Sequence, residues 1–324
     1  MSNRKIRVAV VGTGAFGRNH VRVWRELPDA ELVGILDADA GRAQAVAEEF
    51  QTRVFPDLDA VAQQAEAVSV AVPTKEHARL GCRLLQDGLD VLVEKPIAAT
   101  LEEARGLIAA AERGKRILQA GHLERFNPAI AALDGILRRP LFFEVHRLGI
   151  FTPRSLDIDV VYDVMIHDLD ILLALVSADV TDSRCVGIPV LTDKIDIAHA
   201  RLEFSTGAVA NLTASRISTE RVRKLRFFQE HEYISVDYTR QDVLRVRVKP
   251  DGSSFGFEKI ETQNEEPLRA ELRAFLECCG TRQQPLVDGK AGLRALELAD
   301  RVMRDIREHA QRLKYTSPDI QSAQ

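Results

Sequence analysis

A short polar stripe inside an otherwise apolar stretch is the first feature that could do chemistry. In VYDVMIHDLD, residues 161–170, Asp163 and His167 are four residues apart, and Asp170 follows three residues later. In a helix of about 100° per residue, these three side chains fall on one face, within roughly 60°. The stripe is either the solvent face of an amphipathic helix or a catalytic pair that faces a cleft. Taken alone, the stretch favours the solvent face.

A lysine at the end of an apolar strand is the second candidate. The segment DVLVEKPIA runs from a predicted strand directly into Glu94, Lys95 and Pro96. Packing does not account for charges at the carboxyl end of a buried strand, where an ammonium group can hydrogen-bond a substrate hydroxyl or ketone oxygen. Pro96 makes the turn rigid. The alternative interpretation is an ordinary lysine at a strand end.

A glycine-rich loop near the amino terminus has the spacing of a dinucleotide-binding loop. In VAVVGTGAFGRNH, Gly12, Gly14 and Gly17 follow an apolar strand and open a predicted helix. In this context they allow a tight turn, the approach of a pyrophosphate to the backbone, and close helix packing. Asp37 ends the next strand, where its carboxylate can accept both hydroxyls of an adenosine ribose and would repel a 2′-phosphate. The loop therefore predicts NAD rather than NADP; the alternative is a glycine turn with a capping aspartate.

The segment SVAVPTKEH adds residues to the predicted cofactor site. Pro73 and Thr74 leave a strand at its carboxyl end, where ligands bind in open α/β sheets. His77 lies a turn into the next helix and is either near the cofactor or a packing histidine. The predicted cofactor contacts are Gly12, Gly14, Ala15, Phe16, Gly17, Asp37, Pro73, Thr74, His77, Glu94 and Lys95.

The fold that must position these residues is α/β. Strands and helices alternate at first, which predicts a Rossmann domain with a doubly wound parallel sheet at residues 1–122. The predicted strands are Ile6–Val11, Glu31–Asp37, Ala67–Val72, Asp90–Val93 and Arg116–Ala120. The predicted helices are Ala15–Leu27, Ala40–Phe50, Lys75–Gln86 and Leu101–Arg113, the last with a capping box of Thr100 and Glu103.

The pattern changes after residue 122. One helix near residues 157–176 is followed by long β-rich segments with short turns between them. Two helices close the chain, Pro267–Cys279, stopped by Gly280, and Ala291–Leu313. Residues 123–324 are therefore expected to form an α+β domain with a mostly antiparallel open sheet.

Composition excludes several classes of function. The 324 residues carry a net charge of −4, which offers no basic surface for nucleic acid. No apolar run reaches the roughly 18 residues of a membrane span, and no signal-peptide pattern is present. The four cysteines and the histidines lack metal-ligand spacing, so no metal site is predicted. Reduced thiols in a cytoplasmic protein are expected.

Three motifs together resemble a known family. GTGAFG, EKP and YDVMIHDLD, in this order and spacing, are similar to the motifs of the Gfo/Idh/MocA family of sugar and cyclitol dehydrogenases. The resemblance covers nearly the whole chain. It implies that residues 123–324 bind the substrate and that their open sheet serves as the interface of a homodimer or homotetramer. It also implies that Lys95, Asp163 and His167 are the family's catalytic lysine, aspartate and histidine, which now favours the catalytic interpretation of the stripe.

These three residue types suit the oxidation of a secondary alcohol. A hydride leaves to the nicotinamide while a base removes the hydroxyl proton, and His167 is the expected base near neutral pH. Lys95 would stabilise negative charge on the oxygen, and Asp163 would orient the sugar and the cationic partners. The alternative is that Lys95 is the base, with a pKa lowered by desolvation and by the nicotinamide charge.

The segment AGHLERFNPAI resembles a branch of the family that oxidises the 3-hydroxyl of UDP-N-acetylglucosamine to a ketone, a step toward 3-amino sugars of lipid A in some bacteria. A UDP-sugar is thus the expected substrate. The expected contacts are His122, Arg125, Asn127, Arg147, Arg154, Asp163 and His167, with Arg147 or Arg154 at the diphosphate. Alternatives are a polar linker with purely structural arginines, an inositol or free-sugar substrate, and a sensor that binds the dinucleotide without turnover.

Overall fold

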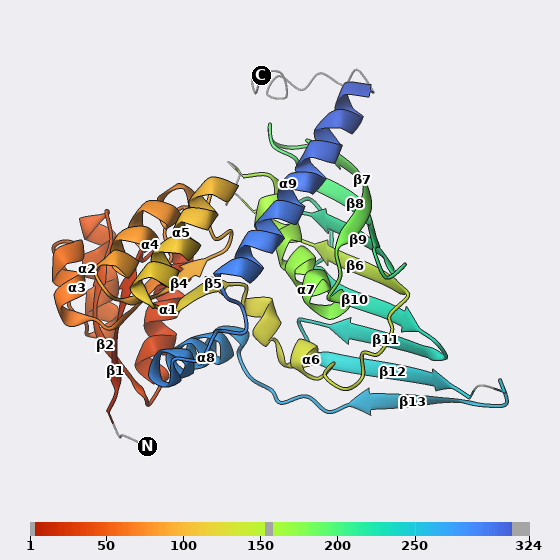
Figure 1. Cartoon of the computed structure of the whole chain (residues 1–324), viewed down its shortest axis with the longest axis horizontal. Helices are drawn as coiled ribbons and strands as arrows, with labels where there is room; N and C mark the ends of the chain where they lie inside the picture. Colours follow the sequence, from red (N-terminus) through yellow and green to blue (C-terminus); the bar gives the residue numbers. More distant parts are fainter. Residues whose placement is uncertain (1–3, 153–157, 250, 313–324) are drawn as a thin grey trace. The chain divides into compact units, whose positions relative to one another are not determined.

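The computed structural model describes residues 4–152, 158–249 and 251–312, and the chain divides into two compact units (Figure 1). Unit 1 combines Met1–Phe126 with Glu265–Leu293, and unit 2 combines Asn127–Asn264 with Arg294–Gln324. Among the described residues, no helix has the length and apolar character that a membrane span requires.

A five-stranded parallel sheet forms the centre of unit 1, in the order β2-β1-β3-β4-β5. Its strands are β1 (Ile6–Val11), β2 (Ala30–Leu36), β3 (Ala67–Val70), β4 (Asp90–Glu94) and β5 (Leu118–Gly121). Nearly continuous apolar runs make these strands suitable for burial on both faces. The strand order reverses between β1 and β3, and ligands of open α/β sheets bind at the carboxyl ends beside such a reversal.

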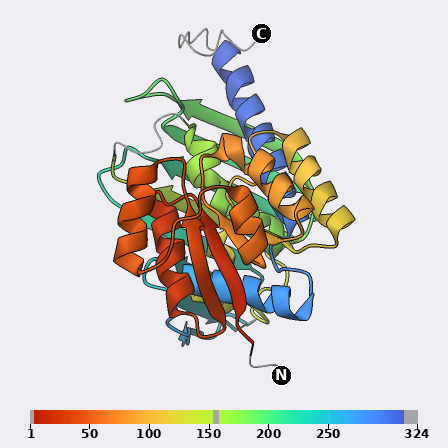
Figure 2. The same cartoon turned by 90° about the vertical axis from the view of Figure 1, so that its left-hand side faces the viewer.

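Helices cover both faces of this sheet (Figures 1 and 2). They are α1 (Ala15–Glu26), α2 (Ala40–Phe50), α3 (Leu58–Gln64), α4 (His77–Gln86), α5 (Leu101–Gly114) and α8 (Pro267–Thr281), with the 3₁₀ turns η1 (Thr74–Glu76) and η2 (Leu123–Phe126). Trp24 of α1 and Phe275 of α8 pack in one core with Leu92 of β4. Gly81 of α4 faces Val93, the next residue of β4, whose side chain points to the opposite face.

The division of the chain differs from the expected boundary after residue 122. Unit 1 continues to Phe126 and takes in α8, which the sequence analysis assigned to the second domain. The apolar stripe of α8, including Leu268, Leu272 and Phe275, completes the core on the α1 face of the parallel sheet. A stripe of this kind predicts a helix but does not identify the sheet that the helix covers.

Unit 2 is built on an eight-stranded sheet in the order β13-β12-β11-β10-β6-β9-β8-β7. All neighbouring strands are antiparallel except β6 and β9, which confirms the mostly antiparallel sheet. The strands are β6 (Phe142–Leu148), β7 (Val180–Ile188), β8 (Ile197–Phe204), β9 (Val209–Ser215), β10 (Val222–Gln229), β11 (Glu232–Asp237), β12 (Asp242–Val248) and β13 (Phe255–Ile260). Alternate residues of β6 are buried, so one face of the sheet carries the core.

Unit 2 also holds α6 (Pro128–Ala131), a π-helical turn η3 (Val161–Met165) and α7 (Ile166–Val176). The long α9 (Gly289–Arg312) begins in unit 1 and continues in unit 2. The helix expected near residues 157–176 is therefore a π-turn followed by an α-helix. Two other details differ from expectation: the seven-residue α3 was not predicted, and α8 continues past Gly280 to Thr281, where Arg282 adopts the left-handed conformation.

Candidate active site

The loop after β1 has the geometry that a bound pyrophosphate requires. Gly12 has a φ of +92°, and a Cβ at this position would overlap the backbone of Ala71. A Cβ on Gly17 would overlap the carbonyl of Gly12, so α1 packs directly on the loop. Space is open around Gly14, which is the N-cap of α1 and provides no side-chain cap. The helix N-terminus thus presents backbone N–H groups beside open space, an arrangement that suits a phosphate.

Asp37 follows β2 and is fixed by several donors. One carboxylate oxygen accepts hydrogen bonds from Thr13 N (2.6 Å) and Thr13 Oγ1 (2.9 Å), and the other accepts one from Asp39 N (2.9 Å). Arg42 also donates to the two carboxylate oxygens, from Nε to one (3.1 Å) and from Nη2 to the other (2.6 Å). Burial alone would raise the pKa of Asp37, but the Arg42 guanidinium and the backbone N–H groups outweigh it and hold the pKa well below its usual range. The carboxylate is ionised, as recognition of a ribose requires.

Thr13 and Arg42 are contributions that the sequence analysis missed. Arg42 lies five residues after Asp37, so it is not adjacent in the sequence, but the first turn of α2 brings it back to the carboxylate. The spacing from a strand-end acid into a following helix was the signal that could have found it. The described residues thus fit a dinucleotide: an open glycine cradle, an uncapped helix N-terminus and an ionised strand-end acid.

The turn after β4 carries Lys95, which is half-buried and follows the buried Glu94. The Lys95–Pro96 peptide bond is cis. Glu94 Oε1 lies 3.0 Å from His20 Nε2 of α1, and both side chains are buried. Glu94 therefore has a partner within the protein core, and His20 is a further residue that the sequence analysis did not single out.

The other residues predicted around the cofactor lie near the same carboxyl edge. Pro73 precedes η1 and Thr74 begins it, three and four residues after the end of β3. Ala15 and Phe16 are exposed in the first turn of α1. His77 is different, because it is almost fully buried and both of its ring nitrogens lie against backbone carbonyls.

The four polar residues of VYDVMIHDLD divide into two pairs in unit 2. Asp163 and His167 are half-buried, whereas Asp168 and Asp170 are 2% exposed. Asp163 lies in the π-turn, where the N–H of Ile166 donates to the carbonyl of Val161, five residues earlier. The count of 100° per residue therefore does not hold across the stripe. Single π-turns within helices occur frequently at functional sites.

Asp168 has the partner that its buried position requires. Arg147 of β6 donates from Nε to one carboxylate oxygen (2.8 Å) and from Nη2 to the other (2.7 Å). The guanidinium also lies over the ring of Tyr238, 4.9 Å from its centroid. Arg147 was expected at a substrate diphosphate, but in this structure its side chain is 6% exposed and forms a buried bidentate ion pair.

The remaining predicted substrate residues occupy several environments. His122 is 1% exposed, and Arg125 is half-buried in η2. Asn127 caps α6, where its Oδ1 accepts from Ala129 N (3.0 Å) and its Nδ2 donates to the carbonyl of Tyr238 (3.1 Å). Arg154 lies outside the described residues.

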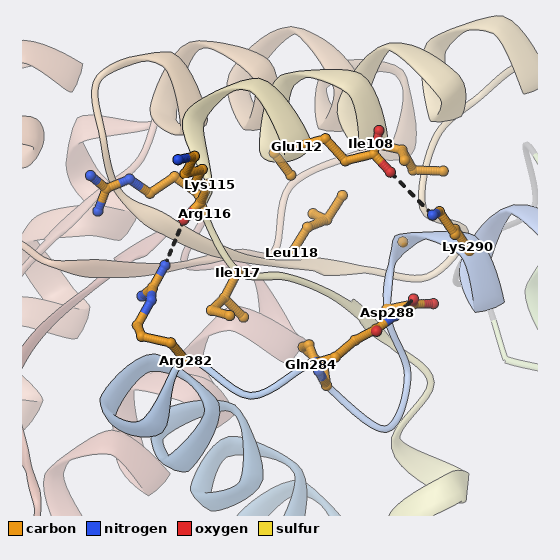
Figure 3. A pocket seen from close by; sticks show the side chains of 13 residues that line it. Ile108, Glu112, Lys115, Arg116, Ile117, Leu118, Arg282, Gln284, Asp288 and Lys290 are labelled. Atoms are coloured by element: carbon orange, nitrogen blue, oxygen red, sulfur yellow. Dashed lines mark hydrogen bonds and ion pairs between the residues drawn. The ribbon is translucent and has the colours of Figure 1, made fainter.

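Unit 1 contains a cavity of about 570 Å³, whose lining includes Leu118, Arg282 and Lys290 (Figure 3). Leu118 and the residues before it line this cavity at the amino end of β5, whereas Gly12, Asp37 and Lys95 follow the carboxyl ends of their strands. Arg282 donates to the carbonyl of Lys115 (2.8 Å), and Lys290 pairs with Glu112 (3.1 Å) across it. The cavity is therefore not part of the predicted cofactor site.

Comparisons with known proteins agree with this geometry. Residues 6–122 match the model of an oxidoreductase family with an NAD-binding Rossmann fold. The chain is 37% identical over 300 residues to the UDP-N-acetylglucosamine 3-dehydrogenase of Acidithiobacillus ferrooxidans. The aligned region covers 91% of this chain and 95% of that protein. A solved structure of the enzyme with this name from the same organism has a TM-score of 0.88 at 36% identity, covering 93% of this chain and 98% of that chain. The scyllo-inositol 2-dehydrogenase (NAD(+)) of Bacillus subtilis is 29% identical over 315 residues, covering 87% of this chain and 89% of that protein.

Proposed function

Because this chain belongs to the Gfo/Idh/MocA family of NAD-binding oxidoreductases, we propose that it oxidises UDP-N-acetylglucosamine at C3 to the 3-keto sugar nucleotide. The observation that carries the choice of substrate is the similarity to the Acidithiobacillus ferrooxidans enzyme, which extends along nearly the whole of both chains. Lys95, Asp163 and His167 are all present, which supports an enzyme over a sensor.

The proposed chemistry divides one oxidation among three side chains. NAD, when bound, accepts the hydride that leaves the carbinol carbon. An imidazole nitrogen of His167 takes the hydroxyl proton, since a histidine pKa suits a base near neutral pH. The ammonium of Lys95 hydrogen-bonds the same oxygen and stabilises its developing negative charge. Asp163 orients the sugar through its carboxylate.

Lys95 is the alternative base. It is half-buried and follows a buried strand, at the carboxyl end where ligands of open α/β sheets bind. Replacing Lys95 by arginine distinguishes His167 from Lys95 as the base. Lys95→Arg keeps a cation but cannot act as a base near neutral pH, because arginine stays protonated. Substantial residual turnover of this variant supports His167 as the base, and its loss supports Lys95.

Recognition of the nucleotide is proposed for Arg125 and Arg154 rather than for Arg147. A guanidinium fork suits the oxygens of a diphosphate. Arg147 already forms a bidentate pair with Asp168, so binding a substrate would require breaking a buried ion pair. Arg125 is half-buried in η2. His122 and Asn127 are proposed to shape this end of the site through their buried positions.

We also propose that a second copy of the chain covers the open face of the unit 2 sheet. Three aromatic rings from neighbouring strands cluster on that face: Phe142 and Phe228 are 5.8 Å apart, and Phe228 and Tyr233 are 5.1 Å apart. Each of these side chains is only partly buried in the single chain. A homodimer or homotetramer would remove them from water.

The proposed location is the cytoplasm, where NAD and UDP-sugars are expected to be available.

A substrate panel tests the proposed activity. The protein is mixed with NAD and with UDP-N-acetylglucosamine, UDP-glucose, scyllo-inositol, myo-inositol or glucose, and NADH is followed at about 340 nm. We expect NADH formation to be fastest with UDP-N-acetylglucosamine. Turnover of an inositol alone would replace the proposal with the inositol dehydrogenase alternative, which the Bacillus subtilis relative favours. NAD binding without turnover of any substrate would favour the sensor.

A further inference from the structure

His77 connects the two turns that follow β3 and β4. It is the first residue of α4 and is 1% exposed. Its Nδ1 lies 2.8 Å from the carbonyl oxygen of Pro96, in the turn that carries Lys95. Its Nε2 lies 2.9 Å from the carbonyl oxygen of Val72, directly before Pro73 and Thr74. One imidazole ring thus links the turn of the proposed catalytic lysine to a turn of the proposed cofactor site.

The two acceptors place a condition on the ring. A carbonyl oxygen accepts a hydrogen bond and never donates one, so each ring nitrogen must carry a hydrogen to bond its carbonyl. Neutral imidazole has one N–H, and only imidazolium has two. The neutral ring can hold one turn, and it then presents a lone pair to the carbonyl of the other.

The surroundings of His77 resist the second proton and also compensate for it. Desolvation lowers the pKa of His77 below its usual value, and the nearby Lys95 ammonium acts in the same direction. The two carbonyl oxygens and the Glu94 carboxylate act in the opposite direction, since each stabilises the imidazolium. Glu94 and Lys95 are the charged groups that face the ring from the end of β4 and the turn after it.

We propose that His77 is a positioning residue for the dehydrogenase: it holds the Lys95 turn and the Thr74 turn together through two hydrogen bonds when doubly protonated, and through one when neutral. This inference rests on the proposed function where turnover is the readout. It assigns no contact between His77 and the cofactor or substrate. It predicts that the link is complete on the acid side of the His77 titration and loses one hydrogen bond as pH rises through it.

The kinetic test uses His77→Gln, because a glutamine amide can donate to one carbonyl and does not titrate. Values of kcat/KM are measured from about pH 5 to 9 for wild type and variant with saturating NAD, and their ratio is plotted against pH. The bases that act in the reaction are present in both proteins, so their titration largely cancels in the ratio. We expect the ratio of the wild-type kcat/KM to that of His77→Gln to be about fivefold larger at the acid end than at the alkaline end. One net hydrogen bond corresponds to a factor of about this size.

The matched control is His309→Gln, which replaces a half-buried histidine in the last turn of α9. Its ratio to wild type should be independent of pH. A ratio for His77→Gln that is equally flat over the range would overturn the proposal, since a residue that only packs would lower the rate by the same factor at every pH.

A second measurement does not depend on turnover or on the variant's folding. In the NAD-bound wild-type protein labelled with ¹⁵N-histidine, the two ring nitrogens of His77 are followed by NMR as pH changes. We expect two protonated nitrogens at the acid end and one above the titration. A single neutral tautomer throughout would contradict the proposal. Should the wild type fail to oxidise any sugar while His77 titrates as expected, the proposed function fails and the link between the turns stands.

Discussion

At the residue scale, the Asp37 carboxylate can bind either donors of the protein itself or the ribose hydroxyls of NAD. In the structure its oxygens accept from Thr13, Asp39 and Arg42, and the same oxygens are those that would bind the ribose hydroxyls of NAD. The Arg42 side chain is 46% exposed and the Asp37 side chain 5%, and Thr13 and Asp39 still donate to the carboxylate when the guanidinium moves. We therefore expect discrimination against NADP to depend on the Asp37 carboxylate, with the Arg42 guanidinium beside it.

Replacing Asp37 by serine tests this arrangement. We expect Asp37→Ser to weaken NAD binding by about tenfold or more, the effect of losing charge-assisted hydrogen bonds, and to strengthen NADP binding because Arg42 is released to meet a 2′-phosphate. Dissociation constants from calorimetry measure both effects. The double variant Asp37→Ser/Arg42→Ala is the control and should lose the gain for NADP. An unchanged preference for NAD in the single variant would show that Asp37 does not decide it.

The catalytic assignments are also tested at single residues. Lys95→Ala and His167→Ala should each lower kcat by about 10² or more, because each removes a group that acts on the reacting oxygen, while NAD still binds. Turnover and NAD affinity are measured on the same preparations. Lys290→Ala, at an exposed lysine of α9 that pairs with Glu112 away from the predicted cofactor site, is the matched control and should keep the wild-type rate. Near-normal rates for both variants would refute the assignment.

At the scale of elements, α7 is anchored to the sheet next to the residues proposed for catalysis. The buried pair of Arg147 and Asp168 joins β6 to the residue that follows His167. Its geometry is bidentate, and the Tyr238 ring covers the guanidinium. The pair thus fixes the start of α7 directly after the π-turn that holds Asp163.

Breaking this ion pair should be strongly destabilising. Arg147→Ala or Asp168→Ala leaves one buried charge without its partner, and we expect either variant to lower the free energy of unfolding by about 3–5 kcal/mol. Urea unfolding followed by circular dichroism measures the loss. Arg79→Ala breaks an exposed ion pair with Glu76 and should change stability by less than about 1 kcal/mol. A loss for Arg147→Ala no greater than that of the control would mean that the pair does not anchor α7.

The sequence predicts helices and strands better than it predicts the contacts between residues far apart in the chain. Strand β1 and helix α2 have their predicted bounds, and the capping box of Thr100 and Glu103 is confirmed, because these features depend on local periodicity and capping. The partner of Asp168 could not be predicted in this way, because Arg147 is 21 residues away in the chain and belongs to a strand. A helical repeat also gives no indication of the hydrogen bond from Ile166 to Val161 that makes the π-turn.

At the scale of the whole molecule, the open face of the unit 2 sheet is the surface proposed for self-association. Wild-type protein should therefore elute with a mass of at least twice the 36.1 kDa of one chain in light scattering coupled to size exclusion. Phe228→Glu introduces a charge into the aromatic cluster of Phe142, Phe228 and Tyr233 and should shift the mass toward one chain. Leu286→Glu, at an exposed leucine of unit 1, is the comparison and should leave the mass unchanged. A wild-type mass of 36.1 kDa would contradict the proposed interface.

The central claim is that the chain transfers a hydride from C3 of UDP-N-acetylglucosamine to NAD. The most direct test supplies this substrate with deuterium at C3 and analyses both products by mass spectrometry and NMR. We predict that the deuterium appears at C4 of the nicotinamide ring and that the sugar nucleotide becomes a 3-ketone. Deuterium retained in the sugar, whether oxidised at another carbon or unreacted in the presence of saturating NAD, would contradict the claim.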